Sequence, residues 1–357
     1  MNAPETGPEP RGAESDAGDS AVVVAALTAA RFIAPGQTRS LTPLAGGVSS
    51  DVFRLELADG RIFAVKRSIP RMRVKALWTA SPDRVSNEVA WLRAARDIDR
   101  DLAPEVVFEV PDAHVFVMAY LDPVSHPVWK SELAAGRVDV NFAAAVGRAL
   151  SRLHAATAGR PDITERFVDR SYFHDLRVEP FLLFPAQQHP QAREALEGLA
   201  AGLGRRAIAL VHGDVSPKNI LVGARGPVFL DSETAVFGDP AFDLAFCLSH
   251  LLLKALWVRE HQDKMAQAFA AFRQTYAAGV DWEPLSDLEA RAAPLLAALL
   301  LARVDGRSPA PYLSDPDETD FVRQKALRLL DQPDLTLDSI AASWRAAAAA
   351  LPPRAAR

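Results

Sequence analysis

Residues 212–219, His-Gly-Asp-Val-Ser-Pro-Lys-Asn, form a polar loop between two short apolar runs, 208–211 and 220–222. A third apolar run, 228–230, is followed directly by Asp231. Such a pattern offers one carboxylate inside the loop and further oxygen ligands at its edges. Phosphoryl transfer needs a carboxylate that orients an acceptor hydroxyl, together with hard oxygen ligands for Mg²⁺. We expect Asp214 to fill the first role. Asn219 and Asp231 are expected to ligate the metal, because both lie at the edges of one antiparallel hairpin.

A second carboxylate follows in Asp231-Ser232-Glu233. Acidic residues two positions apart at the end of a strand point to the same side, which suits one or two Mg²⁺ ions. Glu233 is therefore predicted to be a third metal ligand. The alternative is a structural carboxylate that only accepts hydrogen bonds.

A glycine- and serine-rich segment joins two predicted strands near the N-terminus. Gly46, Gly47, Ser49 and Ser50 lie in Leu-Ala-Gly-Gly-Val-Ser-Ser-Asp-Val-Phe. Glycines let the backbone approach phosphate groups, and serines can donate hydrogen bonds to them. Taken alone, this segment would equally suit a plain hairpin turn.

The catalytic segment resembles the core of the kinases: His-x-Asp, four residues, Asn, then an apolar strand ending in Asp. His-Gly-Asp makes it more similar to the aminoglycoside phosphotransferase and choline kinase superfamily, and residues 238–245, Gly-Asp-Pro-Ala-Phe-Asp-Leu-Ala, strengthen the resemblance. The resemblance implies an ATP-dependent kinase that uses Mg²⁺. It also implies that Asp243 lies on a helix beneath the catalytic loop and accepts hydrogen bonds from the loop backbone.

The resemblance extends to the N-terminal half. Lys66, in Phe-Ala-Val-Lys, resembles the lysine that binds the α- and β-phosphates of ATP, and Glu88 would be its ion-pair partner. Glu105 opens a strand and is a poorer partner. The backbone from Met118 to Tyr120 would read the adenine edge. An ordinary helix-surface charge is the alternative for Glu88, and a plain core strand is the alternative for residues 115–121.

Several departures narrow the class of kinase. His-Gly-Asp lacks the arginine of protein kinases, and residues 231–243 are too few for a regulated activation segment, so a protein kinase is disfavoured. Asp-x-Glu at 231–233 resembles methylthioribose kinase. A methylthioribose-kinase-like or other metabolite kinase, and a non-catalytic nucleotide-binding module, therefore stay open as alternatives. Lys218 could bring positive charge to the γ-phosphate or face solvent.

The phosphate acceptor is expected to be a small hydroxyl-bearing molecule bound by the helical half. Two polar groups of residues are candidates for its site: Tyr172, His174, Asp175, Arg177 and Glu179, and the segment 303–307. Their mixed charge fits a zwitterionic or anionic metabolite at least as well as a polycationic aminoglycoside.

These side chains need a two-lobed α+β frame, a protein-kinase-like fold, to bring them together. We predict a disordered tail over 1–20, a short helix over 21–33, and an N-lobe (21–121) with a five-stranded antiparallel sheet and one helix at 83–97. The C-lobe (122–357) would be helical apart from the catalytic hairpin at 208–233. Its predicted helices are 140–157, 191–203, 242–254, 261–278, 285–302, 320–330 and 337–351.

Composition limits the other possibilities. A net charge of −5 over 357 residues indicates neither a nucleic-acid binder nor a membrane-surface binder, and the sequence leaves the oligomeric state open. The apolar runs 247–258 and 292–304 are shorter than the roughly 20 residues of a membrane span. One cysteine and an acidic N-terminus favour a cytoplasmic protein without a secretory signal.

Overall fold

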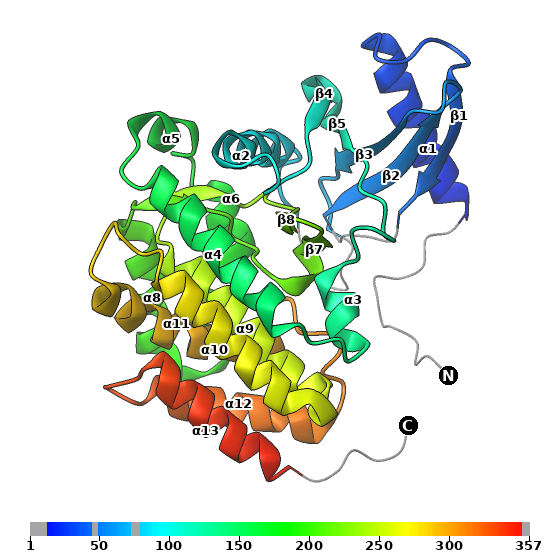
Figure 1. Ribbon diagram of the computed structural model, residues 1–357. Helices are drawn as coiled ribbons and strands as arrows, with labels where there is room; N and C mark the ends of the chain where they lie inside the picture. The colour runs from blue at the N-terminus through cyan, green and yellow to red at the C-terminus, as the bar shows by residue number, and fades with distance from the viewer. Residues whose placement is uncertain (1–12, 45–48, 73–78, 352–357) are drawn as a thin grey trace.

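The computed structural model describes residues 13–44, 49–72 and 79–351, arranged as a small lobe built on a sheet and a larger helical lobe (Figure 1). The small lobe holds five strands, β1 (Thr38–Pro43), β2 (Ser50–Leu57), β3 (Ile62–Ser68), β4 (Val106–Val110) and β5 (Val115–Ala119). They pair in the order β1-β2-β3-β5-β4, and every pairing is antiparallel. The predicted five-stranded antiparallel sheet is confirmed, with helix α2 (Arg84–Ile98) inserted between β3 and β4.

Each face of this sheet is covered by one helix. Alternation along the strands sends Phe53, Leu55 and Val117 to one face, where they share a buried cluster with Val23 and Leu27 of helix α1 (Ala13–Ala29). The opposite face contributes Phe116 and Met118 to the main core, which also contains the apolar side of α2. The strand that carries Lys66 is therefore held on both sides.

Helix α1 corrects the predicted tail. It begins at Ala13, although residues 1–20 were expected to be disordered, and residues 1–12 lie outside the described part of the chain. The helix continues upstream of the apolar stretch that starts at Ala21, and Asp19 forms an ion pair with Arg67 of β3. The first residues of α1, before Ala21, have few apolar side chains, and this tertiary ion pair offsets that lack. Composition alone does not reveal such a contact.

The large lobe is helical, as predicted. Its helices are α3 (Trp129–Ala134), α4 (Val140–Thr157), α5 (Pro161–Arg166), α6 (Ser171–Phe173), α7 (Phe184–Gln188), α8 (Arg193–Arg205), α9 (Ala241–Trp257), α10 (Gln262–Ala277), α11 (Leu285–Asp305), α12 (Pro316–Leu330) and α13 (Leu337–Ala349). Every predicted helical range lies on one of them. A π-helical segment, His174–Leu183, joins α6 to α7 and was not predicted.

Two short antiparallel strand pairs form within residues 209–238. Strands β7 (Ile220–Gly223) and β8 (Gly226–Phe229) form the predicted hairpin, with Asn219 just before it and Asp231 just after it. Strand β6 (Ala209–Val211), expected in the same catalytic unit, pairs instead with β9 (Val236–Gly238), which was not predicted. Because β6 and β9 flank the hairpin in sequence, their pairing closes the polar loops at 212–219 and 230–235 against each other.

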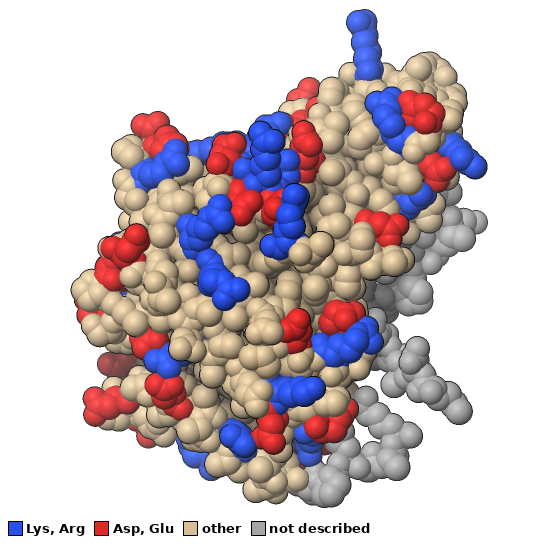
Figure 2. Space-filling view, in the orientation of Figure 1, with Lys and Arg blue, Asp and Glu red and all other residues tan. Residues whose placement is uncertain are grey.

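Charged groups of both signs are interspersed over the face drawn in Figure 2. Among the described residues, no single helix has both the length and the apolar character to cross a membrane. One pair of consecutive helical segments, Ala241–Trp257 and Arg259–Ala277, is long and apolar enough when taken together, but the two are bent by 113° relative to each other.

Helices α4 and α10 approach closely because α4 carries a glycine at the contact. A Cβ at Gly147 would overlap the carbonyl oxygen of Phe272 and lie 2.5 Å from Oγ1 of Thr275, both on α10. Gly198 on α8 is the opposite case, because a Cβ there would meet nothing within 4 Å.

We predict opposite effects for one substitution at these two helical positions. Gly147→Ala should lower the free energy of unfolding by about 1–3 kcal/mol through overpacking. Gly198→Ala should raise it by about 0.5–1 kcal/mol, because alanine loses less backbone entropy in a helix. Urea unfolding followed by circular dichroism measures both. Equal effects of the two variants would show that α4 and α10 are not in tight contact.

Candidate active site

The predicted catalytic loop, residues 212–219, is held at its start by a buried carboxylate. Asp243, in the first turn of α9, accepts hydrogen bonds from the backbone N–H of His212 (2.7 Å) and of Gly213 (2.9 Å). His154 of α4 lies 3.3 Å from the same carboxylate, and its other ring nitrogen is 2.7 Å from the hydroxyl of Tyr276. The hydrogen bonds expected of Asp243 are therefore present, and a chain of polar groups from α10 and α4 supports them.

His212 links the loop to the strand that precedes Asp231. Its Nδ1 accepts a hydrogen bond from the backbone N–H of Asp214 (3.1 Å), so the proton resides on Nε2, which donates to the carbonyl of Leu230 (3.1 Å). Burial lowers the pKa of His212, which keeps the ring in this neutral form. The ring of Trp91 packs edge-on against it at a centroid distance of 4.7 Å.

Gly213 occupies a position that other residues cannot fill. Its φ of +81° lies in the left-handed region, and a Cβ there would lie 2.5 Å from Oγ1 and 2.9 Å from the carbonyl oxygen of Thr234. This close approach brings the loop at 212–219 against the loop at 230–235.

Asp214 is a buried carboxylate between two cations. Arg177, from the π-helical segment, places a guanidinium nitrogen 2.9 Å from Oδ2 of Asp214, and the ammonium of Lys218 is 3.1 Å from the same oxygen. Arg177 also donates to the carbonyl of Gly213. Burial would raise the pKa of Asp214, but the two cations outweigh burial and hold that pKa well below its usual range. The side chain of Lys218 is about half exposed to solvent. Its ammonium lies between Asp214 and Asp231, with Nζ 4.0 Å from Oδ2 of Asp231.

Asn219 and Asp231 offer oxygen atoms beside this carboxylate. The side-chain amide of Asn219 donates to the carbonyl of Asp214 (3.1 Å), which leaves its oxygen as the group available to a cation. Asp231 has a φ of +65°, a strained conformation that occurs often at functional sites. The donor set of one amide oxygen and one carboxylate suits a hard divalent cation such as Mg²⁺.

Lys66 joins the two lobes at this point. Its ammonium is 2.7 Å from the Glu88 carboxylate on α2 and 2.5 Å from Oδ1 of Asp231. Burial opposes its charge, but Asp231 and Glu88 outweigh burial and raise the pKa of Lys66. Burial also raises the pKa of Glu88, despite the attraction of Lys66. The structure thus brings together the lysine, its predicted glutamate partner and the predicted metal ligand.

Helix α2 turns one face toward this site. Arg84 lies one turn before the adjacent Asn87 and Glu88, and all three reach the segment 231–235 or its partner Lys66. The fully buried Arg84 donates to the Glu233 carboxylate (2.9 Å), to the carbonyl of Ser49 and to three further carbonyl oxygens. Glu233 therefore has an arginine partner, the arrangement expected of a structural carboxylate.

Carboxylate oxygens of Glu88, Asp231 and Glu233 lie within 4.8 Å of one another. This cluster could hold a metal by its geometry, and the ammonium of Lys66 and the guanidinium of Arg84 already offset two of its three negative charges. The role of Glu233 as a metal ligand remains a prediction.

Two parts of the predicted nucleotide site are only partly described. Gly46 and Gly47 lie outside the described residues, while Ser49 and Ser50 are buried at the start of β2. In the predicted adenine-reading segment, Met118 is buried and Tyr120 half-buried. The N–H of Ala119 donates to the carbonyl of Glu105 (2.8 Å), so any backbone donor to adenine would have to come from a neighbouring residue.

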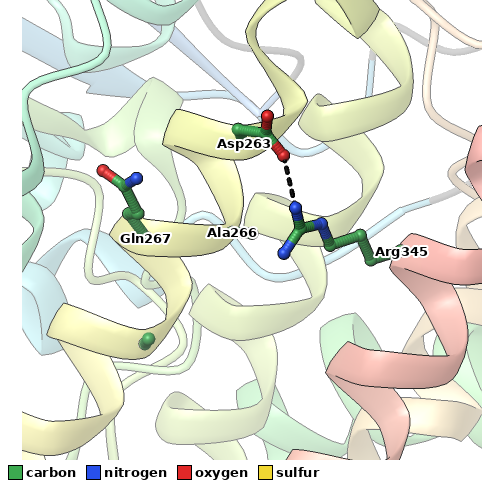
Figure 3. A pocket seen from close by; sticks show the side chains of 5 residues that line it. Asp263, Ala266, Gln267 and Arg345 are labelled. Atoms are coloured by element: carbon green, nitrogen blue, oxygen red, sulfur yellow. Dashed lines mark hydrogen bonds and ion pairs between the residues drawn. The ribbon is translucent and has the colours of Figure 1, made fainter.

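The predicted substrate residues separate into two groups. His174 and Asp175 contact each other at the surface, and Glu179 forms an ion pair with Arg307. Arg177, from the same predicted group as His174, Asp175 and Glu179, contacts Asp214 and the carbonyl of Gly213 in the loop at 212–219. A surface pocket lined by Asp263, Ala266, Gln267, Ala270 and Arg345 lies on α10 and α13 and includes none of these residues (Figure 3).

Three functional contacts were not foreseen from the sequence: Arg84 with Glu233, Asn87 with the carbonyls of Glu233 and Ala235, and Arg177 with Asp214. A signal existed for the first two, because Arg84 and Asn87 lie one turn and one residue before Glu88 on the same helix. No sequence signal indicated that Arg177 would lie against Asp214.

Comparison with known proteins points to one group. The model of the phosphotransferase enzyme family (APH) matches residues 40–288. A methylthioribose kinase from Pectobacterium atrosepticum is 26% identical over 215 residues, which is 53% of this chain and 53% of that protein. One from Bacillus pumilus is 26% identical over 246 residues, 60% of this chain and 61% of that protein. The chain therefore matches only between half and two thirds of the length of these curated relatives.

Solved structures are similar in fold. An amicoumacin kinase (hAmiN) in complex with AMP-PNP, Ca²⁺ and Ami has a TM-score of 0.59 at 14% identity, with 90% of this chain and 97% of that chain covered. Plasmodium vivax ethanolamine kinase has a TM-score of 0.55 at 13% identity, with 92% and 90% covered. Together with the family match, these likenesses confirm the predicted bilobal, protein-kinase-like fold.

We predict that Arg84 and Glu233 are energetically coupled. Arg84→Met should lower the free energy of unfolding by about 3–5 kcal/mol, because it leaves the Glu233 carboxylate buried without its cation. The double variant Arg84→Met/Glu233→Gln should lose less than the sum of the two single losses in urea unfolding. Arg345→Met, which breaks the exposed pair with Asp263, is the control and should cost below about 1 kcal/mol. Strictly additive losses at Arg84 and Glu233 would contradict this coupling.

Proposed function

The chain belongs to the phosphotransferase enzyme family, and from this membership and the convergence of Lys66, Asp231 and Asp214 we propose that it is an ATP-dependent kinase that phosphorylates a hydroxyl group of a small molecule. The observation that carries the proposal is a continuous series of ion pairs. Lys66 contacts Asp231, and Lys218 lies between Asp231 and Asp214. The group expected to bind phosphates and the group expected to meet the acceptor are therefore neighbours in one series of ion pairs.

Asp214 would act on the acceptor. Its carboxylate would accept a hydrogen bond from the acceptor hydroxyl and, as the oxygen attacks the γ-phosphorus, take up the proton. The bond between that phosphorus and the oxygen bridging to the β-phosphate breaks, and ADP leaves. The pKa of Asp214 is well below its usual range, so its main contribution is to orient the hydroxyl rather than to act as a strong base.

Lys66 would bind the α- and β-phosphates of ATP, in a position fixed by Glu88. Gly46, Gly47, Ser49 and Ser50 would contact the phosphates, and the backbone from Met118 to Tyr120 would bind adenine. The AMP-PNP in the related amicoumacin kinase supports a nucleotide at this site.

Asn219 and Asp231 would hold Mg²⁺, which neutralises charge on the phosphates when bound. Both residues offer an oxygen at the cleft, and the Ca²⁺ in the amicoumacin kinase complex supports a divalent cation. Glu233 would contribute only if it left Arg84.

The acceptor is a metabolite in this proposal rather than an aminoglycoside. The methylthioribose kinases among the relatives make methylthioribose one acceptor to test. We place the enzyme in the cytoplasm, where its one cysteine, the buried and unpaired Cys247, would stay reduced. The deciding experiment is ATP consumption against a panel of hydroxyl-bearing metabolites and aminoglycosides. Nucleotide binding without phosphoryl transfer to any acceptor would favour a non-catalytic nucleotide-binding module instead.

Asp214→Asn should lower kcat by about 10²- to 10⁴-fold, because the neutral amide orients the hydroxyl less well than the carboxylate and cannot take up its proton. The thermal shift produced by AMP-PNP and Mg²⁺ should persist, since the phosphate-binding groups are unchanged. Asp334→Asn, at an exposed aspartate of the C-lobe, is the matched control and should retain wild-type kcat. Undiminished phosphorylation by Asp214→Asn would refute the mechanism.

Asp231→Asn should abolish the Mg²⁺-dependent part of the AMP-PNP thermal shift, because one carboxylate ligand is lost. Glu233→Gln should leave that part intact and lower only the unfolding temperature without ligand. A weaker Mg²⁺ dependence in Glu233→Gln would instead identify Glu233 as a metal ligand.

A further inference from the structure

A series of cationic side chains begins at the catalytic carboxylate and continues into the C-lobe. Arg177 pairs with Asp214, and its guanidinium lies 5.9 Å from the ring centres of both Phe181 and Phe246. Arg303, near the end of α11, lies 5.8 Å from the same Phe181 ring. Two arginines from separate elements thus meet one aromatic pair beside the catalytic loop.

Helix α9 adds two more nitrogen-bearing groups to this series. Phe246, His250 and Lys254 are four residues apart, so they form one stripe on the helix. The His250 ring lies 5.0 Å from that of Phe246. Lys254, only 2% exposed, places its ammonium 4.1 Å from the ring centre of Tyr312 and 4.8 Å from that of Trp257. His250 and Lys254 of α9, together with Arg177 and Arg303 from the neighbouring elements, form a set of nitrogen-bearing side chains that we call the basic stripe.

Beyond Arg177, these groups lack acidic partners. In the described part of the chain, no carboxylate lies within ion-pair distance of Lys254, Arg303 or His250. Buried polar atoms without a hydrogen-bond partner among the described residues gather here as well: Nδ1 of His250, Nε of Arg303 and the hydroxyl of Tyr312. Such atoms are rare in folded proteins, and each one requires an explanation.

The basic stripe differs from other enclosed cations of the described residues, such as Arg84 and Arg291, because those cations have carboxylate partners. Arg84 pairs with Glu233, and Arg291 pairs with Asp239 and Glu283. For Lys254, burial and the nearby charges of Lys130 and Arg303 all lower the pKa, well below its ordinary value. A buried charge without a counter-ion is destabilising, and groups of this kind concentrate at functional sites.

We propose that the acceptor of this kinase carries an anionic group, a carboxylate or a phosphate, which Arg303 and Lys254 bind while the acceptor hydroxyl lies at Asp214. The inference rests on the proposed function and specifies its substrate class. The anion supplies the missing counter-charge, and the hydroxyl of Tyr312 and the ring of His250 supply further hydrogen bonds. Cationic acceptors such as aminoglycosides would be repelled by the same residues.

Direct anion binding tests the site without relying on catalysis. The wild type, saturated with AMP-PNP and Mg²⁺ to occupy the nucleotide site, should bind acetate or inorganic phosphate in calorimetric titration. Lys254→Met and Arg303→Met should weaken that binding at least 10-fold and leave AMP-PNP affinity unchanged. Lys264→Met, at an exposed lysine of α10, is the control and should bind like the wild type.

Thermal unfolding separates a binding role from a structural one. Lys254→Met should keep or raise the unfolding temperature, because an apolar side chain of similar length replaces an uncompensated buried amine. A lower unfolding temperature, or unchanged anion affinity in both methionine variants, would overturn the proposal.

A panel of acceptors then identifies the anion. Hydroxy acids, phosphorylated alcohols, neutral sugars and amino alcohols are compared for ATP consumption, and either anionic class should give a kcat/KM at least 10-fold above the others. The two methionine variants should raise KM for that acceptor and not for ATP. Preference for a neutral or cationic acceptor would refute the proposed anionic acceptor and would leave the proposed kinase function intact. Absence of transfer to every acceptor, with anion binding still dependent on Lys254, would instead refute the kinase function.

Discussion

Lys66 lies between a carboxylate of the small lobe and a carboxylate of the large lobe, and this contact fixes how the two halves of the site meet. Glu88 comes from α2 and Asp231 from the end of the β7–β8 hairpin, so one ammonium joins a strand, a helix and a loop that are far apart in sequence. These two carboxylates offset the cost of burying the ammonium. The geometry of the cleft therefore depends on keeping all three groups together, which explains why so many neighbouring contacts serve to hold them.

Those supporting contacts come from both sides. In the small lobe, the face of α2 that carries Glu88 also carries Arg84 and Asn87, which hold the segment after Asp231. In the large lobe, Asp243 accepts two backbone N–H groups of the catalytic loop and is itself contacted by His154. His212 connects the two arrangements, because its ring bonds the loop on one side and the carbonyl before Asp231 on the other. Displacement of any one of these elements would move Asp214 or Asp231.

The sequence predicted the parts of this arrangement that depend on short spacing or on a family resemblance. The β7–β8 hairpin follows from apolar runs around a glycine turn, and the fold class follows from the order of strands and helices together with the catalytic motif. The contacts of Arg84 and Arg177 were missed because their partners lie 149 and 37 positions away, and side-chain type alone does not indicate which distant carboxylate an arginine will meet. Strand β9 was missed because three residues are too few for an alternating pattern, and its pairing with β6 arises from the tertiary fold. The first turns of α1 were missed for a similar reason, since the ion pair of Asp19 with Arg67 is a tertiary contact.

Asp214 lies where two parts of the candidate site with opposite excess charge meet. On the side of the proposed nucleotide site, the three carboxylates of Asp231, Glu88 and Glu233 contact only two cations, Lys66 and Arg84, so the carboxylates outnumber the cations by one. On the other side, Arg177 and the cations behind it face a single carboxylate, that of Asp214. Asp214 therefore lies at the boundary between a group of side chains with an excess of carboxylates and a group with an excess of basic residues. A carboxylate so placed remains ionised and fixed in direction, which suits the role proposed for it in orienting a hydroxyl, and the basic residues behind it are the reason why the proposed acceptor carries a negative charge.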